Sequence, residues 1–481
     1  MNNSSSPRSI SKSTTFALIV FVGLAAMYLL VARLALRGFP YSGDEYSMFL
    51  QAELFARGMM KSPAPPHAEW LRVDHVVIDS WVRSKYPPGT PALLALGARA
   101  GLAWLVTPCE ALIALVAVWL ATRRLLGPSA AFVALLTLGL APLFAFQAAS
   151  FYSNTTATMF LAVGFAGIAA WTKRQSPAWM LLVGAAIGCA FLTRPIDAIL
   201  FGLAMMSLKS IRAVVVAGMS AVPFVLLNLA YQKAQFGSPF RDGYHVYEPT
   251  FAALYGPAAA ANPVLVSYLW NPLQLWNHID IYRALVVDWT VPGTALVALV
   301  GAFSIGQDHP GRPMRAFSVA LIGTYVTALL FTIADVDDGA RPRYLSIVLI
   351  PVAFLTAGGF GPSCTALAAR FGPRVKTSLI AVSLVFAPAQ LASYLVTQVP
   401  RVWKREGLFR AVDKAALDDA VVVVRAANPS RYARNGALFD RKVLYLSAPP
   451  TTSVQTIAMA YPGRAIWEAH EGEPWTLTRA P

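Results

Sequence analysis

Long runs of apolar residues recur along the whole chain, and they limit the folds that are open to it. Runs such as residues 16–36 and 317–331 contain almost no charge. A stretch of about 20 apolar residues crosses a bilayer as a helix, because a helix satisfies its own backbone hydrogen bonds. Only 13% of the 481 residues are charged and 56% are hydrophobic, whereas roughly a quarter of an ordinary soluble protein is charged. We therefore predict an all-α polytopic membrane bundle.

About eleven membrane-spanning helices are predicted from these runs. Their approximate ranges are 15–36, 107–124, 129–147, 154–172, 178–193, 195–209, 211–231, 285–305, 315–333, 343–360 and 377–397. The range 195–209 is short for a span. The first run is too long for the core of a cleaved signal peptide, so we expect it to remain as a span.

Basic residues gather in short connections at every second turn of this arrangement. They are Arg8, Lys12, Arg123, Arg124, Lys173, Arg174, Lys209, Arg212, Arg312, Arg315, Arg370, Arg374 and Lys376. Short loops rich in lysine and arginine stay in the cytoplasm. This rule places the tail 1–14 inside the cell, and it explains the formal net charge of +15 without a nucleic-acid partner.

The polar mass of the chain is predicted to lie on the extracytoplasmic side of the membrane. It comprises a first outer loop at 37–106, a second at 232–283, a short loop at 334–342 and a tail at 398–481, around a transmembrane domain at 15–397. Loops of such length usually carry structure or function of their own. β-Prone runs at 421–424 and 443–446 alternate with Pro, Gly and charged residues, which predicts a small C-terminal α/β domain.

An acidic pair, Asp44 and Glu45, follows the first span directly. Apolar residues recur at helical spacing from Met48 onward, opposite polar ones such as Gln51, which predicts an amphipathic helix at the membrane surface. Ser42 and Glu45 fit the pattern of a capping box, so the pair can simply begin this helix. Alternatively, Asp44 lies at the membrane boundary, where partial desolvation raises the pKa of a carboxylate and makes it a better general base.

Cations at three further places are candidates for a functional role. Lys85 precedes two prolines that fix an extended turn, which either aims it at the membrane surface or leaves it as an interfacial snorkelling lysine. Arg194 interrupts an apolar region, where it either faces a polar cavity or pairs locally with Asp197. The guanidinium groups of Arg341 and Arg343 suit a phosphate, but they can also neutralise three nearby aspartates.

Ring side chains accompany these charges in the sequence. The candidates for contact with a substrate are Tyr86, Tyr244, His245 and Tyr344. Rings in outer loops can stack on sugars or anchor a loop at the membrane interface. His245 lacks the spacing of a zinc site, while a divalent ion held by Asp44 and other carboxylates stays open.

Four segments, in this order, resemble the GT-C superfamily of membrane glycosyltransferases. They are Asp44-Glu45 after the first span, Lys85-Tyr86-Pro87-Pro88-Gly89 before the second, Arg123-Arg124-Leu125-Leu126-Gly127 at its end, and Phe236-Gly237-Ser238-Pro239-Phe240 after a central span. The chain is similar to the bacterial branch related to protein O-mannosyltransferases of glycosyltransferase family 39, aminoarabinose transferases and Rgt-type lipopolysaccharide sugar transferases. The likeness covers residues 15–360.

The resemblance implies a multi-pass enzyme of a bacterial inner membrane that takes its sugar from a polyprenyl-phosphate donor. An envelope glycan, lipid or protein would be the acceptor, and inversion at the sugar would follow from direct attack. Asp44, with Glu45 as its neighbour, would act at the reaction centre. Basic residues would hold the donor phosphate, and the candidates are Lys85, Arg194, Arg341 and Arg343. Tyr86 departs from the family pattern, because it separates the lysine from the prolines.

Two other classes of protein stay open. A transporter or flippase would place its polar residues near the bilayer midplane, whereas the ionisable residues of this chain concentrate in outer loops. A catalytically inactive scaffold would only bind lipid or sugar through its tail. An enzyme requires Asp44, Lys85, Arg341 and Arg343 around one outward cavity, which is the arrangement that separates these alternatives.

Overall fold

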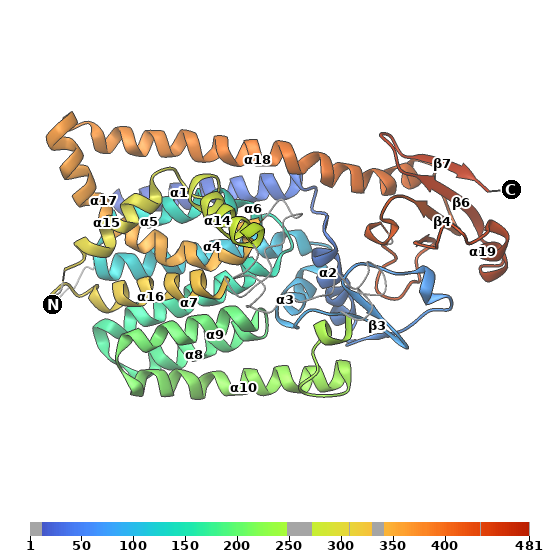
Figure 1. Cartoon of the computed structure of the whole chain (residues 1–481), viewed down its shortest axis with the longest axis horizontal. Coiled ribbons are helices and arrows are strands. Elements are labelled where there is room, and N and C mark those ends of the chain that lie inside the picture. Colours follow the sequence, from blue (N-terminus) through green and yellow to red (C-terminus); the bar gives the residue numbers. More distant parts are fainter. Residues whose placement is uncertain (1–11, 248–271, 307, 330–340, 433, 481) are drawn as a thin grey trace, which may run out of the picture.

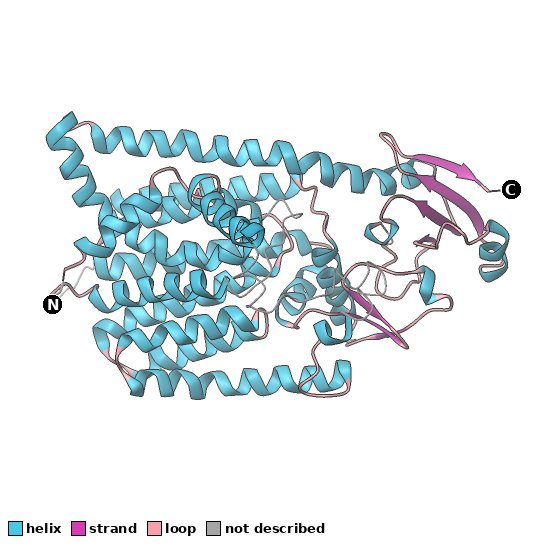
Figure 2. Cartoon of the chain, viewed as in Figure 1, coloured by secondary structure: helices cyan, strands magenta, loops and turns pink. Residues whose placement is uncertain are grey.

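Helices run side by side along the long axis of the molecule, and the strands lie near one end (Figures 1 and 2). The computed structural model describes residues 12–247, 272–306, 308–329, 341–432 and 434–480. Most of the described chain is helical, in agreement with the predicted membrane bundle. The turn between α17 and α18 lies at the end of the bundle opposite the C-terminal sheet (Figure 1).

Helices, most of them apolar, form the bundle. Their bounds are α1 (Lys12–Leu30), continued by η1 (Val31–Ala35), α4 (Val106–Leu126), α5 (Pro128–Gly139), α6 (Pro142–Ala148), α7 (Ser153–Arg174), α8 (Pro177–Phe191), α9 (Pro195–Ala204), η4 (Met205–Leu208), α10 (Ile211–Phe236), α14 (Pro272–Val287), α15 (Thr294–Ser304), α16 (Arg312–Leu329), η5 (Arg341–Val348), α17 (Leu349–Phe371) and α18 (Val375–Lys414). Proline begins α5, α8 and α9, because its missing N–H costs nothing in the first turn of a helix.

Within the described residues, six helices are long and apolar enough to cross a membrane, or up to seven if a bent pair is one span. The bent pair is α5 with α6, at an angle of 68°, in the range predicted as the single span 129–147. Pro142 explains the break, since proline cannot continue the helical hydrogen bonds of the preceding turn. The predicted number of about eleven spans is not confirmed, because α8, α9 with η4, and α15 are shorter apolar helices.

Small residues let several of these helices approach closely. A Cβ atom on Gly301 of α15 would lie 1.8 Å from the carbonyl oxygen of Leu355 in α17, and one on Gly184 of α8 would lie 2.0 Å from that of Ala217 in α10. Such contacts are typical of membrane helices, whose association depends on close packing rather than on the hydrophobic effect.

The first outer loop folds into helices and a small sheet. Its elements are α2 (Gly43–Ala56), β1 (Ser62–Pro63), η2 (Ala68–Trp70), β2 (Val76–Ile78), β3 (Trp81–Ser84), α3 (Gly89–Ala98) and η3 (Ala103–Leu105), with antiparallel strands in the order β1-β3-β2. The prediction of an amphipathic surface helix with a polar outer face is wrong for α2 at Gln51, while Arg57 of that face is exposed. Gln51 is fully buried, donates to the Met60 carbonyl at 2.7 Å and accepts from the Ser84 amide at 3.0 Å.

A four-stranded sheet follows α18. Its elements are β4 (Ala420–Arg425), η6 (Pro429–Arg431), β5 (Val443–Leu446), α19 (Val454–Ala460), β6 (Ala465–His470) and β7 (Thr476–Arg479), in the strand order β5-β4-β6-β7. β4 pairs in parallel with β5 and β6, and β7 pairs antiparallel with β6. Both predicted β-prone runs are strands, and α18 continues without a break across residue 398, where the domain boundary was predicted.

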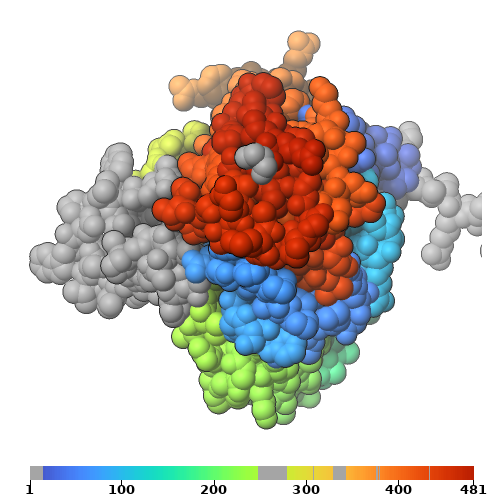
Figure 3. Space-filling view, turned by 90° about the vertical axis from the view of Figure 1, so that its right-hand side faces the viewer, coloured from blue at the N-terminus to red at the C-terminus, as the bar shows by residue number. Residues whose placement is uncertain are grey.

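The C-terminal sheet and the first outer loop share one hydrophobic core. Leu50, Leu54 and Val82 of the loop pack in the same buried cluster as Val422 and Leu446 of the sheet. In Figure 3, the C-terminal residues (orange to red) lie directly against those of the first outer loop (blue). On the polar side of α2, the Glu53 carboxylate accepts from the Ala437 amide at 3.0 Å, so this contact covers part of that side.

Candidate active site

The first turn of α2 carries both members of the acidic pair, and the capping box predicted for it is present. The Ser42 hydroxyl accepts from the Glu45 amide at 3.2 Å, and the Glu45 carboxylate accepts from the Ser42 amide at 2.9 Å. Glu45 also accepts from the amides of Tyr41 at 3.2 Å and Phe151 at 2.8 Å, and it is fully buried. Glu45 therefore anchors the start of α2 to the loop before α7.

Asp44 lies on the same turn but faces a different environment. The Tyr86 hydroxyl donates to its Oδ1 atom, and the Nε2 atom of His75 lies 3.4 Å from the same oxygen. Nη1 of Arg343 lies 3.3 Å from Oδ2. Since 17% of the Asp44 side chain remains exposed, the structure joins α2, the loop before β2, the turn after β3 and η5 around one accessible carboxylate.

The pKa of Asp44 shifts in the direction opposite to the prediction. Burial raises it, as expected, but the neighbouring His75, Arg343 and Lys85 and the hydrogen bond from Tyr86 together lower it below its usual range. Burial also lowers the pKa of His75, so its ring is neutral near pH 7. Arg343 and Lys85 then remain as the charges that keep Asp44 ionised, and the prediction failed because these cations are brought in from distant segments.

Lys85 lies among tyrosine rings beside Asp44. Its Nζ atom is 4.8 Å from the ring centroid of Tyr244, 4.7 Å from that of Tyr247 and 5.3 Å from that of Tyr86. Rings at such distances attract a cation through their electron-rich faces. Tyr86 and Tyr244 also meet edge to face at 5.8 Å, so the second outer loop closes over the lysine.

Arg343 is held on both sides by the bundle. Its carbonyl accepts from the Asn154 side chain at 2.7 Å, and its guanidinium lies 5.0 Å from the ring centroid of Tyr152. The same guanidinium donates to the Tyr344 hydroxyl at 3.2 Å. These contacts fix Arg343 at the start of its helical segment, with its charge directed to Asp44.

Arg194 also lies near the Tyr344 ring. Its guanidinium donates to the carboxylate of Asp197, as in the local pair that the sequence left open, and lies 3.4 Å from the Ser153 hydroxyl. It also lies 5.6 Å from the Tyr344 ring centroid, and the Arg343 guanidinium lies 5.2 Å from it. The two arginines therefore contact one shared ring.

Two candidates from the sequence are not part of this cluster as described. Arg341 begins η5, but its side chain lies outside the described residues, as do the aspartates at 335, 337 and 338. His245 is exposed and interacts with Asp242, whose Oδ1 lies 2.7 Å from the His245 Nδ1 atom. No contact between His245 and Asp44 is found among the described residues.

His75 and Asn154 were not predicted from the sequence, whereas Tyr247 belongs to the aromatic residues of the second outer loop that were expected to stack on sugars or anchor the loop. The His75 amide donates to the Tyr247 hydroxyl at 2.9 Å, and its backbone adopts the left-handed region with φ of 65°. A left-handed non-glycine residue is uncommon, but nothing in the sequence indicates it. Asn154 looks in the sequence like an ordinary residue at the start of a span.

Carboxylates of the described residues do not gather as metal ligands do. Where the structure describes the chain, no group of three or more His, Cys, Asp or Glu side chains is placed to hold a metal ion. Asp44 instead has cationic and hydrogen-bonding neighbours, which suit an anionic ligand close by.

Comparisons with known proteins concern the family and the fold. A family model described as dolichyl-phosphate-mannose-protein mannosyltransferase matches residues 86–217. No curated protein matches the sequence significantly. The match contains the turn at Lys85-Tyr86 from Tyr86 onward, Asn154 and Arg194, but neither Asp44 nor Arg343.

Solved structures share the fold over almost the whole chain. ArnT from Cupriavidus metallidurans in the apo state has a TM-score of 0.57 at 14% identity, with 95% of this chain and 93% of that chain covered. The same protein bound to undecaprenyl phosphate has a TM-score of 0.53. The oligosaccharyltransferase of Archaeoglobus fulgidus, in complex with zinc and sulfate, has a TM-score of 0.51 at 11% identity, with 94% and 68% covered. At such identities the likeness concerns the fold.

The fold and the apolar helices define a multi-pass integral membrane protein. The family match and the shared fold confirm the predicted resemblance to the GT-C superfamily of membrane glycosyltransferases.

Proposed function

We propose that this chain transfers a sugar from a polyprenyl-phosphate donor to an acceptor hydroxyl at the extracytoplasmic face of a bacterial inner membrane. The observation that carries the proposal is the Asp44 carboxylate, which lies 3.3 Å from the Arg343 guanidinium and near Lys85 at one end of an apolar bundle. The mannosyltransferase family match and the likeness to ArnT, which has been solved with undecaprenyl phosphate, support a lipid-linked donor. An envelope glycan, lipid or protein would supply the hydroxyl.

In this mechanism, Asp44 accepts the proton of the acceptor hydroxyl while the oxygen attacks the anomeric carbon. The bond from that carbon to the phosphate oxygen breaks, polyprenyl phosphate leaves and the configuration inverts. Arg343 and Lys85 stabilise the charge that grows on the phosphate, and Arg194 and Arg341 are further candidates for this role. Glu45 acts indirectly, by holding the turn on which Asp44 lies.

A donor phosphate would compete with Asp44 for the same cations, and this competition would adjust the pKa of Asp44 to its role as a base. Arg343 and Lys85 lower its pKa in this structure, and a fully compensated carboxylate is a weak base. A donor phosphate that attracts these cations removes part of the compensation. The pKa of Asp44 then rises, so that it becomes a stronger base when a donor is bound.

The transport alternative is less well supported. Transporters bind their substrates near the bilayer midplane. Asp44 and Lys85 lie outside all candidate spans among the described residues, and Arg343 is the first residue of the span Arg343–Phe371. This position of the charges supports chemistry at the surface rather than passage through the bundle.

Mass spectrometry of envelope glycans and lipopolysaccharide tests the proposal for any acceptor among them. We expect cells that lack this chain to lose one sugar modification, and the wild-type chain to restore it. Asp44→Asn should lower the restored amount by at least about 100-fold, because a missing general base costs that much or more. Immunoblots of the membranes control for the amount of each variant.

Asp79→Asn provides the matched control, because Asp79 lies in the same outer loop and pairs with Arg83 at 2.8 Å rather than with the site. It should restore the sugar like the wild type. Restoration by Asp44→Asn would exclude Asp44 as the base. Identical glycans with and without the chain would contradict the proposed transfer itself.

A further inference from the structure

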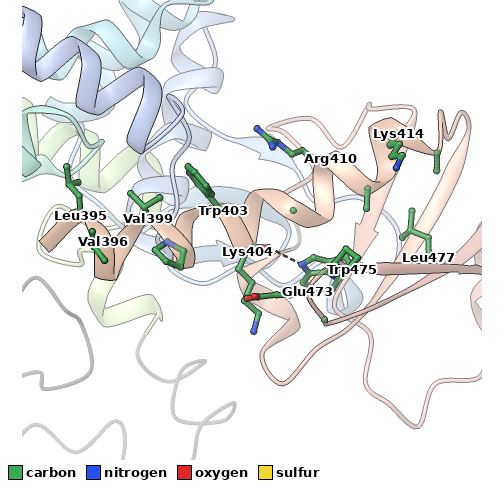
Figure 4. Close-up of a pocket in the computed structure, with 16 residues that line it drawn as sticks. Leu395, Val396, Val399, Trp403, Lys404, Arg410, Lys414, Glu473, Trp475 and Leu477 are labelled. Atoms are coloured by element: carbon green, nitrogen blue, oxygen red, sulfur yellow. Dashed lines mark hydrogen bonds between the residues drawn. The ribbon is translucent and has the colours of Figure 1, made fainter. Parts of the chain in front are cut away.

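A groove of about 1110 Å³ runs along α18 beyond the bundle. One wall is the stretch of α18 from residue 395 to its end at Lys414, with Ala415 after it, and the other is the segment 472–477, which leads into β7. Figure 4 shows Leu395 and Val396 at one end of the groove, and Lys414 and Leu477 at the other. The groove lies apart from Asp44 and takes no part in the proposed mechanism.

The chemical character of the groove changes along its length. The helix contributes only apolar side chains from Leu395 to Trp403, and then the cations Lys404, Arg410 and Lys414. Glu473 is the single carboxylate among the lining residues, so the lining is net positive. An elongated site that is apolar at one end and cationic at the other complements an amphiphile with an anionic head.

The three cations that line the groove can still interact with an anionic ligand. Lys404 lies 3.2 Å from Glu471, and Arg410 lies 3.1 Å from Glu406 one helical turn earlier. Both of these pairs are partly exposed to solvent, and exposed pairs are weak. Among the described residues, Lys414 forms no ion pair, so a phosphate would gain charge partners at small cost.

Trp403 marks the level of the membrane boundary on the groove. Its indole N–H donates to the carbonyl of Ala35 at 3.2 Å, and Ala35 ends the first candidate span, Thr15–Ala35. The guanidinium of Arg37 lies 4.1 Å from the centroid of the same ring. Tryptophan and arginine at the end of a span are typical of the headgroup layer. The apolar end of the groove therefore lies at the depth of acyl chains, and its cationic end lies outside them.

The length of α18 supports this placement. Its 40 residues span about 60 Å, twice the roughly 30 Å of the hydrocarbon core, so the helix must project out of the membrane. The cationic end of the groove lies on this projecting part.

We propose that the groove binds an anionic phospholipid of the outer leaflet, with its acyl chains against Leu395, Val396 and Val399 and its phosphate against Lys404, Arg410 and Lys414. The lipid would bridge α18 and the segment before β7, and thereby tether the C-terminal sheet to the bilayer. This role is independent of the sugar-transfer reaction.

Native mass spectrometry of the delipidated full-length chain, titrated with phosphatidylglycerol or with phosphatidylcholine of the same acyl chains, tests the proposal. We expect phosphatidylglycerol to bind more tightly. Arg410→Gln combined with Lys414→Gln should weaken its binding by about 30-fold, because each basic residue near an anionic lipid contributes several-fold to affinity. Arg401→Gln, on the same helix but outside the groove, should bind like the wild type.

A second variant tests the apolar end separately. Val396 is 73% exposed, so Val396→Gln should leave the fold intact while it weakens both lipids. Glycerol phosphate, which has the head but no tails, should not displace phosphatidylglycerol. Equal binding of the two lipids, unchanged binding by the double variant or by Val396→Gln, or displacement by glycerol phosphate would each overturn the proposal.

Discussion

Tyr86 shows how a single inserted residue can change a site. In the sequence it only separates Lys85 from the two prolines, as a departure from the family pattern. In the structure its hydroxyl donates to Asp44 and its ring lies beside the Lys85 ammonium. The additional tyrosine thus contacts both Asp44 and Lys85, the two charges on which the candidate site depends.

Asp44 and Glu45 are neighbours in sequence, yet their pKa values shift in opposite directions. Cations and a hydroxyl lower the pKa of Asp44 despite its burial. Burial raises the pKa of Glu45 to about 7, since its backbone hydrogen bonds offset only part of the desolvation. A helix turns by about 100° per residue, so adjacent side chains face different surroundings.

The pKa of Glu45 predicts a pH-dependent contribution to stability. Because the folded value of about 7 exceeds the ordinary 4.5, the contribution is complete below pH 4.5 and is lost as the pH rises through 7. Glu45→Gln removes this dependence but leaves one buried amide unsatisfied, at a cost of about 1–3 kcal/mol. We expect it to melt below the wild type at acidic pH, with a gap that narrows toward pH 8.

Thermal unfolding of the detergent-purified chain across this pH range measures the effect. Glu69→Gln, an exposed substitution in the same outer loop, should follow the wild-type curve. A gap between Glu45→Gln and the wild type that stays constant with pH would show that Glu45 does not titrate in this range.

At the scale of elements, two other segments of the chain hold the turn from Lys85 to Gly89 in place. The amide of Gly89 donates to the carbonyl of Leu192 at 2.7 Å, which brings the loop of Arg194 alongside. Gly243 of the second outer loop lies so close that a Cβ atom would be 2.2 Å from the Lys85 carbonyl oxygen. Three segments that are far apart in sequence therefore position one cation.

Gly243→Ala should displace the Lys85 backbone, because the clash involves main-chain atoms that cannot rotate away. We expect at least about a tenfold loss of sugar transfer, since small misplacements of charged groups are costly in catalysis. Mass spectrometry of the envelope glycans measures it, as for Asp44→Asn. Gly202→Ala is the control, because nothing lies within 4 Å of its added Cβ atom. Full activity of Gly243→Ala would show that the turn position is unimportant.

At the scale of the whole molecule, the C-terminal sheet is built into the outer face of the protein. Besides the shared core, the Ser430 hydroxyl donates to Asp74 at 2.6 Å, next to His75 of the candidate site. Ser62 donates to the carbonyl of Ala437 at 2.8 Å. The C-terminal sheet region thus supports the first outer loop, which carries Asp44.

Deletion of residues 416–481 should therefore destabilise more than the sheet itself. It would expose Leu50, Leu54 and Val82, and a buried side chain of this size contributes about 1.5–3 kcal/mol. We expect a lower melting temperature, aggregation and loss of sugar transfer. Size-exclusion chromatography and thermal unfolding measure the first two. Lys442→Ala, an exposed substitution in the same sheet region, should behave like the wild type, and a truncated chain that melts like the full one would contradict the shared core.

Local patterns were sufficient for the features that depend on local physics. Apolar runs identified most of the bundle helices, because the membrane demands them wherever they occur. The capping box at Ser42 and Glu45 and the strands at 421–424 and 443–446 were likewise predicted, since each depends on residues within a few positions of one another.

Only the tertiary structure decided how these parts act together. The low pKa of Asp44 and the contacts of His75 depend on Arg343 and Tyr247, which lie far away in sequence, and Gln51 is buried through Met60 and Ser84 of the same outer loop. Periodicity reports which side of a helix is apolar, but not what covers the other side. The sequence alone therefore determined a membrane bundle with charged outer loops, and folding determined which charges meet, because electrostatic energies depend on distances in space.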